Sequence, residues 1–147
     1  MDNSDKTLAG VCGLYCGCCP IYRAYKDGYK EFLMFMAKAT GVEEVACEGC
    51  RSEKCWGGDC YFKKCASKKG VDFCFECPEY PCQLLLDFSE TAAHRQVIFE
   101  NSERIREIGW KKWLEEEDRR WRCPSCGSKI SYYNVKCLSC GTRLNRI

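Results

Sequence analysis

The chain has 147 residues, 46% of them hydrophobic and 13% aromatic, and its formal net charge is only +2. This composition excludes a disordered chain, and the length predicts one ordinary domain with a small additional module. No apolar run approaches the roughly 18 residues of a membrane span, and the N-terminal residues do not resemble a secretory signal, so we expect a soluble, cytoplasmic protein.

Cysteine dominates the chemistry of the chain, since 16 of the 147 residues are cysteine. Thiols in the cytosol are kept reduced, so a cysteine content this high indicates metal ligands rather than disulfides. A disulfide-stapled secreted module is the weaker interpretation.

The charges are unevenly distributed. Residues 119–147 contain seven Lys or Arg and no Asp or Glu, which leaves 16 basic and 21 acidic residues before them. Four thiolates around one Zn²⁺ carry a net charge of −2, so part of this basic excess would neutralise such a site. The remainder lies beside Tyr132 and Tyr133 and favours contact with phosphate or with an acidic protein surface.

The first structural elements are a cysteine-rich loop and a helix. Residues 10–19 are too rich in glycine for regular structure, whereas Pro20 suits the first position of a helix. Apolar residues then recur at steps of three and four, which predicts one helix that ends before Gly41, kinks near Gly28 and turns one face to the core. This face consists of Tyr22, Tyr25, Tyr29, Phe32, Leu33 and Met36.

Residues 46–82 contain eight cysteines and have no sustained period of 2 or 3.6 residues. We therefore predict a series of turns and single helical turns that metal ligation holds together. The cysteines are Cys47, Cys50, Cys55, Cys60, Cys65, Cys74, Cys77 and Cys82.

Three helices are expected next, over residues 82–88, about 91–101 and 102–120, with the third broken at Gly109. Ser89 and Ser102 are candidate N-caps. His94 is the single histidine of the chain, and within a helical stretch it is predicted to be a surface or capping residue rather than a ligand.

The C-terminal segment has the clearest metal-binding pattern. Two Cys-x-x-Cys pairs at this separation can place four thiolates about 2.3 Å from one Zn²⁺. Gly127 and Gly141 each follow the second cysteine of a pair, where glycine can adopt the positive φ that turns backbone N–H groups toward sulfur. The predicted ligands are Cys123, Cys126, Cys137 and Cys140.

Four stretches of the N-terminal part carry a family resemblance: Cys12-Gly-Leu-Tyr-Cys-Gly-Cys-Cys-Pro-Ile, Cys47-Glu-Gly-Cys-Arg-Ser, Lys64-Cys-Ala-Ser-Lys-Lys-Gly-Val and Cys74-Phe-Glu-Cys-Pro-Glu-Tyr-Pro-Cys. They resemble the family called domain of unknown function 3795, and residues 101–126 resemble the helical tail and appended ribbon of its longer members. The resemblance implies a cysteine-rich, zinc-binding protein without an established activity. Cys18 and Cys55 depart from the family pattern. The cysteines that match it, and that we predict as ligands, are Cys12, Cys16, Cys19, Cys47, Cys50, Cys60, Cys65, Cys74, Cys77 and Cys82.

How these cysteines divide among sites stays open at the level of sequence. Twelve cysteines before residue 83 would make three four-cysteine sites, whereas the ten family-like positions would make two sites with two thiols left over. An iron–sulfur protein is the main alternative, because Cys12, Cys16 and Cys19 have the spacing of the radical enzymes that bind a cluster. Those enzymes need most of a β/α barrel, and because a full barrel takes about 250 residues, this chain is too short to be one of them. Thiol–disulfide exchange ranks lowest, because no βαβ pattern surrounds the Cys-x-x-Cys pairs.

These observations predict a small α-rich, metal-organised, cysteine-rich domain of irregular loops and helices in residues 1–120. A small β-hairpin zinc ribbon is expected to follow in residues 121–147. All-cysteine sites are closed, so the predicted function is a non-catalytic zinc-binding adaptor with several structural Zn²⁺ ions per chain. Its expected partner is a protein or a nucleic acid that contacts the basic C-terminal ribbon. The alternative is an iron–sulfur protein with a redox or electron-transfer role.

Overall fold

A computed structural model of the chain describes residues 3–56, 60–132 and 134–144. Two 3-10 helices, η1 (Asn3–Leu8) and η2 (Cys16–Cys18), precede the helices α1 (Pro20–Asp27) and α2 (Lys30–Thr40). The middle of the chain contains α3 (Tyr61–Lys69), the 3-10 helix η3 (Cys74–Glu76), α4 (Gln83–Glu90) and the 3-10 helix η4 (Ala93–Arg95). The last two helices are α5 (Ile98–Ile108) and α6 (Trp110–Arg120).

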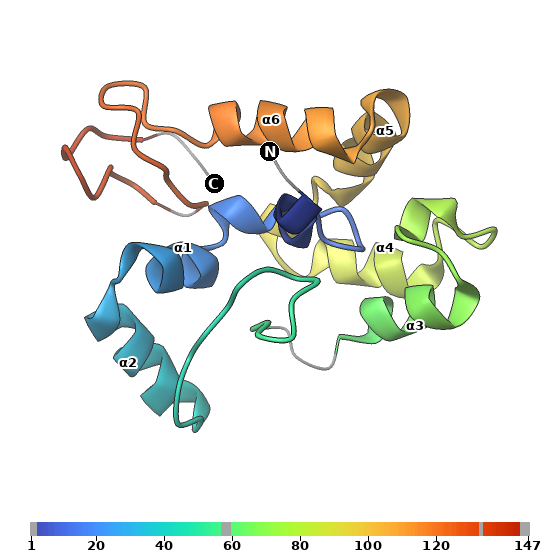
Figure 1. Ribbon diagram of the computed structural model, residues 1–147, viewed down its shortest axis with the longest axis horizontal. Helices are drawn as coiled ribbons and strands as arrows, with labels where there is room; N and C mark the ends of the chain where they lie inside the picture. The colour runs from blue at the N-terminus through green and yellow to red at the C-terminus, as the bar shows by residue number, and fades with distance from the viewer. Residues whose placement is uncertain (1–2, 57–59, 133, 145–147) are drawn as a thin grey trace.

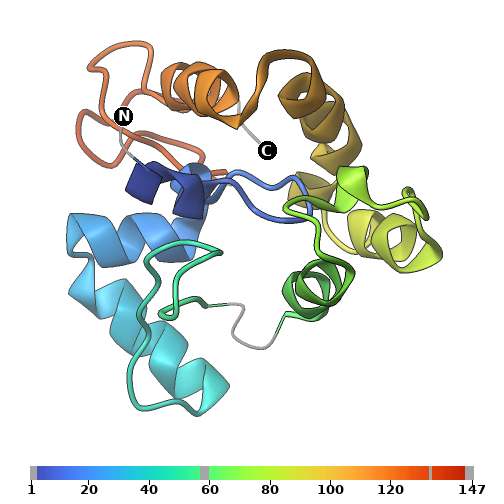
Figure 2. The same ribbon diagram turned by 45° about the vertical axis from the view of Figure 1, so that its right-hand side comes forward.

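The N-terminal segment lies at the centre of this arrangement. Figures 1 and 2 show it between the α1–α2 pair and the α3–α4 pair, with α5 and α6 above it. The largest core cluster joins the two ends of the cysteine-rich domain, because Tyr15 packs edge-on against Trp113 with ring centroids 5.9 Å apart. A second cluster forms around Leu85 and Ile98, both fully buried. Among the described residues no helix has both the length and the apolar character needed to cross a membrane.

The single kinked helix predicted after Pro20 is instead two helices. Gly28 has a φ of 78° and its N–H bonds to the carbonyl of Ala24, which ends α1 in the left-handed conformation that glycine tolerates best. The chain then changes direction, so α2 does not continue the buried face of α1. No residue of α2 is buried, and Met34 and Phe35 are 69% and 66% exposed. Of the predicted core face, Tyr22 is buried and Leu33 and Met36 pack partly buried against the same cluster, whereas Tyr29 and Phe32 are exposed.

The helices after residue 82 differ from the prediction in their other bounds, but the break at Gly109 and the end at Arg120 are as predicted. Ser89 and Ser102 are not N-caps, because both lie inside helices, where their hydroxyls donate to the carbonyls of Leu86 (2.6 Å) and Ile98 (2.7 Å). Serine forms such bonds to the preceding turn when it is buried within a helix. The cysteine-rich helical part of the prediction is otherwise compatible with the fold.

The predicted β-hairpin zinc ribbon is wrong. The described part of the chain contains no β-strand, and the C-terminal segment has only two isolated bridges, Arg122 with Lys129 and Lys136 with Arg143. Each bridge closes one cysteine loop on itself, so the two loops do not pair with each other as the strands of a hairpin. The side chain of Asn134 closes the connection between them, since its Oδ1 accepts bonds of 2.8 Å from both N and Oγ of Ser131.

Candidate metal centre

The four C-terminal cysteines converge on one point. Their sulfur atoms all lie within 4.8 Å of one another, and the pairs Cys123–Cys140 and Cys126–Cys137 are 3.6 Å apart. Four sulfurs bound at about 2.3 Å to a tetrahedral ion would be separated by roughly 3.8 Å. The thiols therefore stand close to the corners that one metal ion requires, and small shifts would complete the site.

The two cysteine loops are copies of one unit, offset by 14 residues. The first reads Trp-Arg-Cys-Pro-Ser-Cys-Gly-Ser-Lys-Ile over residues 121–130, and the second reads Val-Lys-Cys-Leu-Ser-Cys-Gly-Thr-Arg-Leu over residues 135–144. This similarity predicts that both loops fold in the same way.

The backbone hydrogen bonds bear this out. The N–H of Gly127 donates to the carbonyl of Cys123 at 2.9 Å, and that of Gly141 donates to Cys137 at 2.8 Å. The N–H of Cys123 donates to the carbonyl of Ser128, and the N–H of Cys137 donates to the carbonyl of Thr142, both at 2.8 Å. The glycines have φ values of 77° and 79°, as their positions in the sequence predicted. An approximate twofold repeat thus supplies two ligands from each loop.

Hydrogen-bond donors around the sulfurs favour thiolates. The N–H of Cys126, together with that of Ser125 at 3.4 Å, lowers the pKa of Cys123. The hydroxyl and N–H of Ser128 lower the pKa of Cys126 to about 6. In Cys137 the equivalent N–H groups also lower the pKa, but burial and the neighbouring thiols outweigh them and raise it. Metal ligands of this type must be deprotonated, and these donors favour that form in Cys123 and Cys126.

The cluster of the four C-terminal cysteines has a buried side and an exposed side. Cys123 and Cys137 are 3% and 2% exposed and pack with Ile130 and Leu144, which occupy equivalent positions in the two loops. Cys126 and Cys140 are exposed. The first cysteine of each pair therefore belongs to a small core, while the second faces outward.

Several contacts hold these loops against the helical part. The N–H of Tyr132 donates to the carbonyl of Cys18 at 3.0 Å, and the indole of Trp121 donates to Glu117 at 3.0 Å. His94 stacks on Tyr132 with ring centroids 4.3 Å apart, so it serves as a packing residue. Figures 1 and 2 show the loops beside α1 and one end of α6. Tyr133, predicted as part of the basic aromatic surface, lies outside the described residues.

Eight of the twelve N-terminal cysteines form two groups. In the first, the thiol of Cys50 interacts with those of Cys16 and Cys55, and Cys55 also interacts with Cys47. These interactions and burial raise the pKa values of Cys50 and Cys47. Apart from the C-terminal four, no set of three ligand atoms in the described residues lies mutually within 4.8 Å. The first group is thus brought together without the spacing of a single-ion site.

The second group surrounds Leu85 and Ile98, where Cys12 is buried and Cys60, Cys74 and Cys82 pack against it. Burial raises the pKa of Cys12 and of Cys74 to about 12. No disulfide joins any of the described cysteines.

The remaining four N-terminal cysteines make other side-chain contacts. Cys18 donates to the carbonyl of Tyr15 at 3.3 Å, Cys19 interacts with Tyr132, Cys65 interacts with Tyr61, and Cys77 accepts a bond of 3.4 Å from Lys69. Cys65 and Cys77 lie beside the second group, because both interact electrostatically with Cys74, whereas Cys19 interacts with Cys18 and Tyr132.

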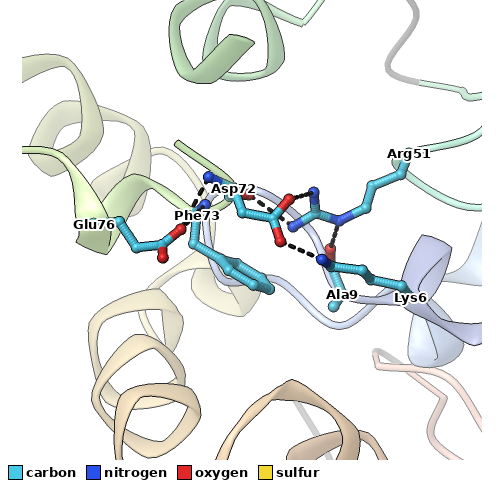
Figure 3. Close-up of polar contacts among 6 residues, drawn as sticks. All are labelled: Lys6, Ala9, Arg51, Asp72, Phe73 and Glu76. Carbon is cyan, nitrogen blue, oxygen red and sulfur yellow. Dashed lines mark hydrogen bonds and ion pairs between the residues drawn. The ribbon is translucent and has the colours of Figure 1, made fainter. Parts of the chain in front are cut away.

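A polar network fixes the first group against the N-terminal segment (Figure 3). Arg51, next to Cys50, donates to the carbonyl of Ala9 at 2.8 Å and to the carboxylate and carbonyl of Asp72 at 3.0 and 2.9 Å. Lys6 forms an ion pair with the same carboxylate, and the guanidinium of Arg51 lies 4.6 Å from the ring centroid of Phe73. Burial would raise the pKa of Asp72, but Lys6 and Arg51 lower it overall. One arginine therefore ties three distant segments together.

Two features of the site were missed by the sequence analysis. One is the 14-residue repeat, which an alignment of residues 121–130 with 135–144 would have revealed. The other is the place of Cys55 in the first N-terminal group, for which the sequence carries no signal because its partners are set by the fold of the loop.

Comparison with known proteins gives a family match. Residues 8–87 match a family described as protein of unknown function (DUF3795). These residues cover more than half of the chain and include all twelve N-terminal cysteines, whereas the C-terminal loops lie beyond them. No curated protein and no solved structure matches the chain.

Proposed function

The chain belongs to this family of proteins of unknown function, and we propose that it is a non-catalytic protein whose C-terminal cysteines bind one structural Zn²⁺ ion. The observation that carries the proposal is the convergence of four thiols within 4.8 Å, supplied in pairs by two equivalent loops. Four protein ligands fill the tetrahedral positions of zinc and leave none open for a water or a substrate, which is the mark of a structural site.

The separation of the thiols favours one ion over a cluster. A cluster spreads its cysteine ligands over different iron atoms, so their sulfurs stand farther apart than four ligands of one ion. Distances of 3.6 Å between two of the pairs fit the single ion. The two N-terminal groups are where further ions would bind in this proposal, as the family resemblance implies.

The test is the metal content and colour of the full chain purified without oxygen. Zinc in a colourless sample, reduced by about one ion per chain in a Cys140→Ser variant, would support the proposal. Stoichiometric iron with visible charge-transfer absorbance would instead support the iron–sulfur alternative.

The zinc-bound loops serve, in this proposal, as a docking surface for an acidic protein face. Part of the basic excess is already paired within the chain, because Arg122 and Lys129 form ion pairs with Asp118 at 3.0 and 3.8 Å. Lys136 and Arg143 form the bridge of the second loop. Two exposed apolar side chains flank this basic pair, Val135 at 70% and Leu138 at 60%. A short basic and apolar surface suits a protein partner better than the long phosphate track of a nucleic acid.

Polyglutamate is a suitable probe of this surface, with single-stranded oligothymidine as the comparison. A Lys136→Ala/Arg143→Ala double variant should bind polyglutamate about 2- to 30-fold more weakly than wild type, since each surface charge contributes about 0.2–1 kcal/mol. Lys68→Ala on α3 is the matched control and should bind normally. Unchanged binding by the double variant, or tighter binding of the oligonucleotide with a steep salt dependence, would contradict the acidic-protein partner.

A further inference from the structure

Helix α2 turns two of its largest apolar side chains away from the rest of the molecule. Leu33, Met36 and Ala37 pack against the core cluster beneath the helix. Met34 and Phe35 point away from that face and are exposed. Figures 1 and 2 show α2 at the edge of the molecule. The outer face of this helix therefore has no partner among the described residues.

A groove of about 740 Å³ runs along α2 beside these side chains. Met34 and Phe35 line it on the helix side, and residues 42–45, which follow the helix, line the other side. Val42 is exposed in this lining and Val45 is buried. The two exposed side chains and the groove form one continuous, largely apolar surface, of the kind that marks an interaction site.

One stripe of this surface carries opposite charges at its two ends. It consists of residues at positions i, i+3, i+4 and i+7, which share one face of a helix. These residues are Glu31, Met34, Phe35 and Lys38. Neither Glu31 nor Lys38 forms an ion pair with another described residue. Both charges are thus available to a partner.

The lining as a whole has nearly balanced charge. Besides Glu31 and Lys38 it includes Lys30, Glu43 and Glu44, so two lysines stand against three glutamates. A strongly acidic protein, a strongly basic protein or an anionic membrane would therefore meet like charges as well as opposite ones. A second copy of this chain carries both signs in the same order, so it can match them.

Two copies of α2 match along the whole stripe when they pack antiparallel about a twofold axis. An axis between Met34 and Phe35 places residue 31 of each copy opposite residue 38 of the other, because such an axis uses the same patch on both copies. Each Glu31 then faces a Lys38. Each Phe35 faces a Met34 at the edge of the groove, and contacts between methionine sulfur and an aromatic ring are favourable.

We propose that this face of α2 is a homodimer interface, in which two copies pack antiparallel through the stripe from Glu31 to Lys38 and the groove beside it. The helix has 11 residues, so the contact is small and the dimer is a weak one. No residue of the groove belongs to the cysteine loops, so the dimer is independent of the proposed zinc site and of its docking surface.

The test is sedimentation velocity of the full chain, purified without oxygen and kept reduced so that no disulfide links two copies. Between about 1 µM and 1 mM the wild type should change from monomer to dimer. Phe35→Ser removes one aromatic ring from each side of the interface and should weaken the dimer at least about 30-fold. Leu84→Ser changes an exposed apolar residue of α4 that does not line the groove, so it is the matched control and should dimerise normally. Circular dichroism should show unchanged helix content in both variants.

Charge reversal tests the antiparallel arrangement itself. Glu31→Lys gives a stripe with two lysines and Lys38→Glu a stripe with two glutamates, so each variant alone should dimerise roughly tenfold more weakly than wild type. An equal mixture of the two variants should recover association, because each stripe then meets one of opposite charge.

Three results would overturn the proposal. They are a wild-type chain that stays monomeric at every concentration, a dimer that persists in Phe35→Ser, and single charge variants that do not recover on mixing. A monomer whose Phe35 signals in nuclear magnetic resonance respond to phosphatidylcholine vesicles would assign this face to a lipid surface instead.

Discussion

Replacing one ligand should unfold the C-terminal loops and spare the helices. Ile130 and Leu144 are the only buried aliphatic side chains of the described loop residues, and each contributes about 1.5–3 kcal/mol on burial. A structural Zn²⁺ contributes on the order of 10–16 kcal/mol, so the ion outweighs the apolar core of the loops. In Cys137→Ser we therefore expect residues 121–144 to lose hydrogen-exchange protection and the chain to lose about one zinc ion. Helices α5 and α6 should keep most of their protection, because Ile105, Trp113 and Leu114 are buried in the main core.

Hydrogen exchange followed by mass spectrometry, with elemental analysis of the same samples, measures both effects. Ser139→Ala is the matched control, since it lies in the same loop, keeps its backbone N–H and is not a ligand. If Cys137→Ser kept wild-type protection in residues 123–144, metal would not organise the loops. Equal loss in the loops and in α6 would show that a module boundary near residue 120 is wrong.

Three further outcomes are expected. Burial raises the pKa of Glu117, so protonation of this carboxyl group favours the folded state, and that stabilisation is lost as the pH rises from the ordinary pKa of about 4.3 through the folded pKa. Between about pH 5 and pH 8, the free energy of unfolding in urea should therefore fall less for Glu117→Gln than for wild type. Parallel pH profiles of the two proteins would contradict this. Arg51→Ala should lower the free energy of unfolding by about 1–3 kcal/mol, because it removes three hydrogen bonds of one charged group. Glu53→Ala, in the same loop, should change it little. Equal unfolding midpoints for these two variants would refute the role of the network. Chelation should abolish hydrogen-exchange protection in residues 46–82 before that of α5 and α6, and simultaneous loss would place the metal-dependent core elsewhere.

The sequence predicted best what depends on local chemistry. Pro20, Gly41 and Gly109 begin or end helices as expected, because each acts through its own backbone conformation. The convergence of the four C-terminal cysteines was also predicted from spacing alone, since a Cys-x-x-Cys loop brings its two sulfurs together without help from the rest of the fold.

Tertiary packing decided what the sequence could not. The predicted apolar face runs across the turn at Gly28, but only Leu33 and Met36 of α2 pack against the core, and Tyr29 and Phe32 stay exposed. The prediction of a β-hairpin was wrong because each cysteine loop closes on itself with a single bridge. Cys16 interacts with Cys50 across 34 positions, a contact that no local pattern encodes.

X-ray absorption at the zinc edge, on the full chain purified without oxygen, tests the central claim most directly. The proposal predicts zinc with a shell of four sulfur atoms at about 2.3 Å. Iron in place of zinc, or a zinc shell of nitrogen and oxygen at about 2.0–2.2 Å, would contradict it.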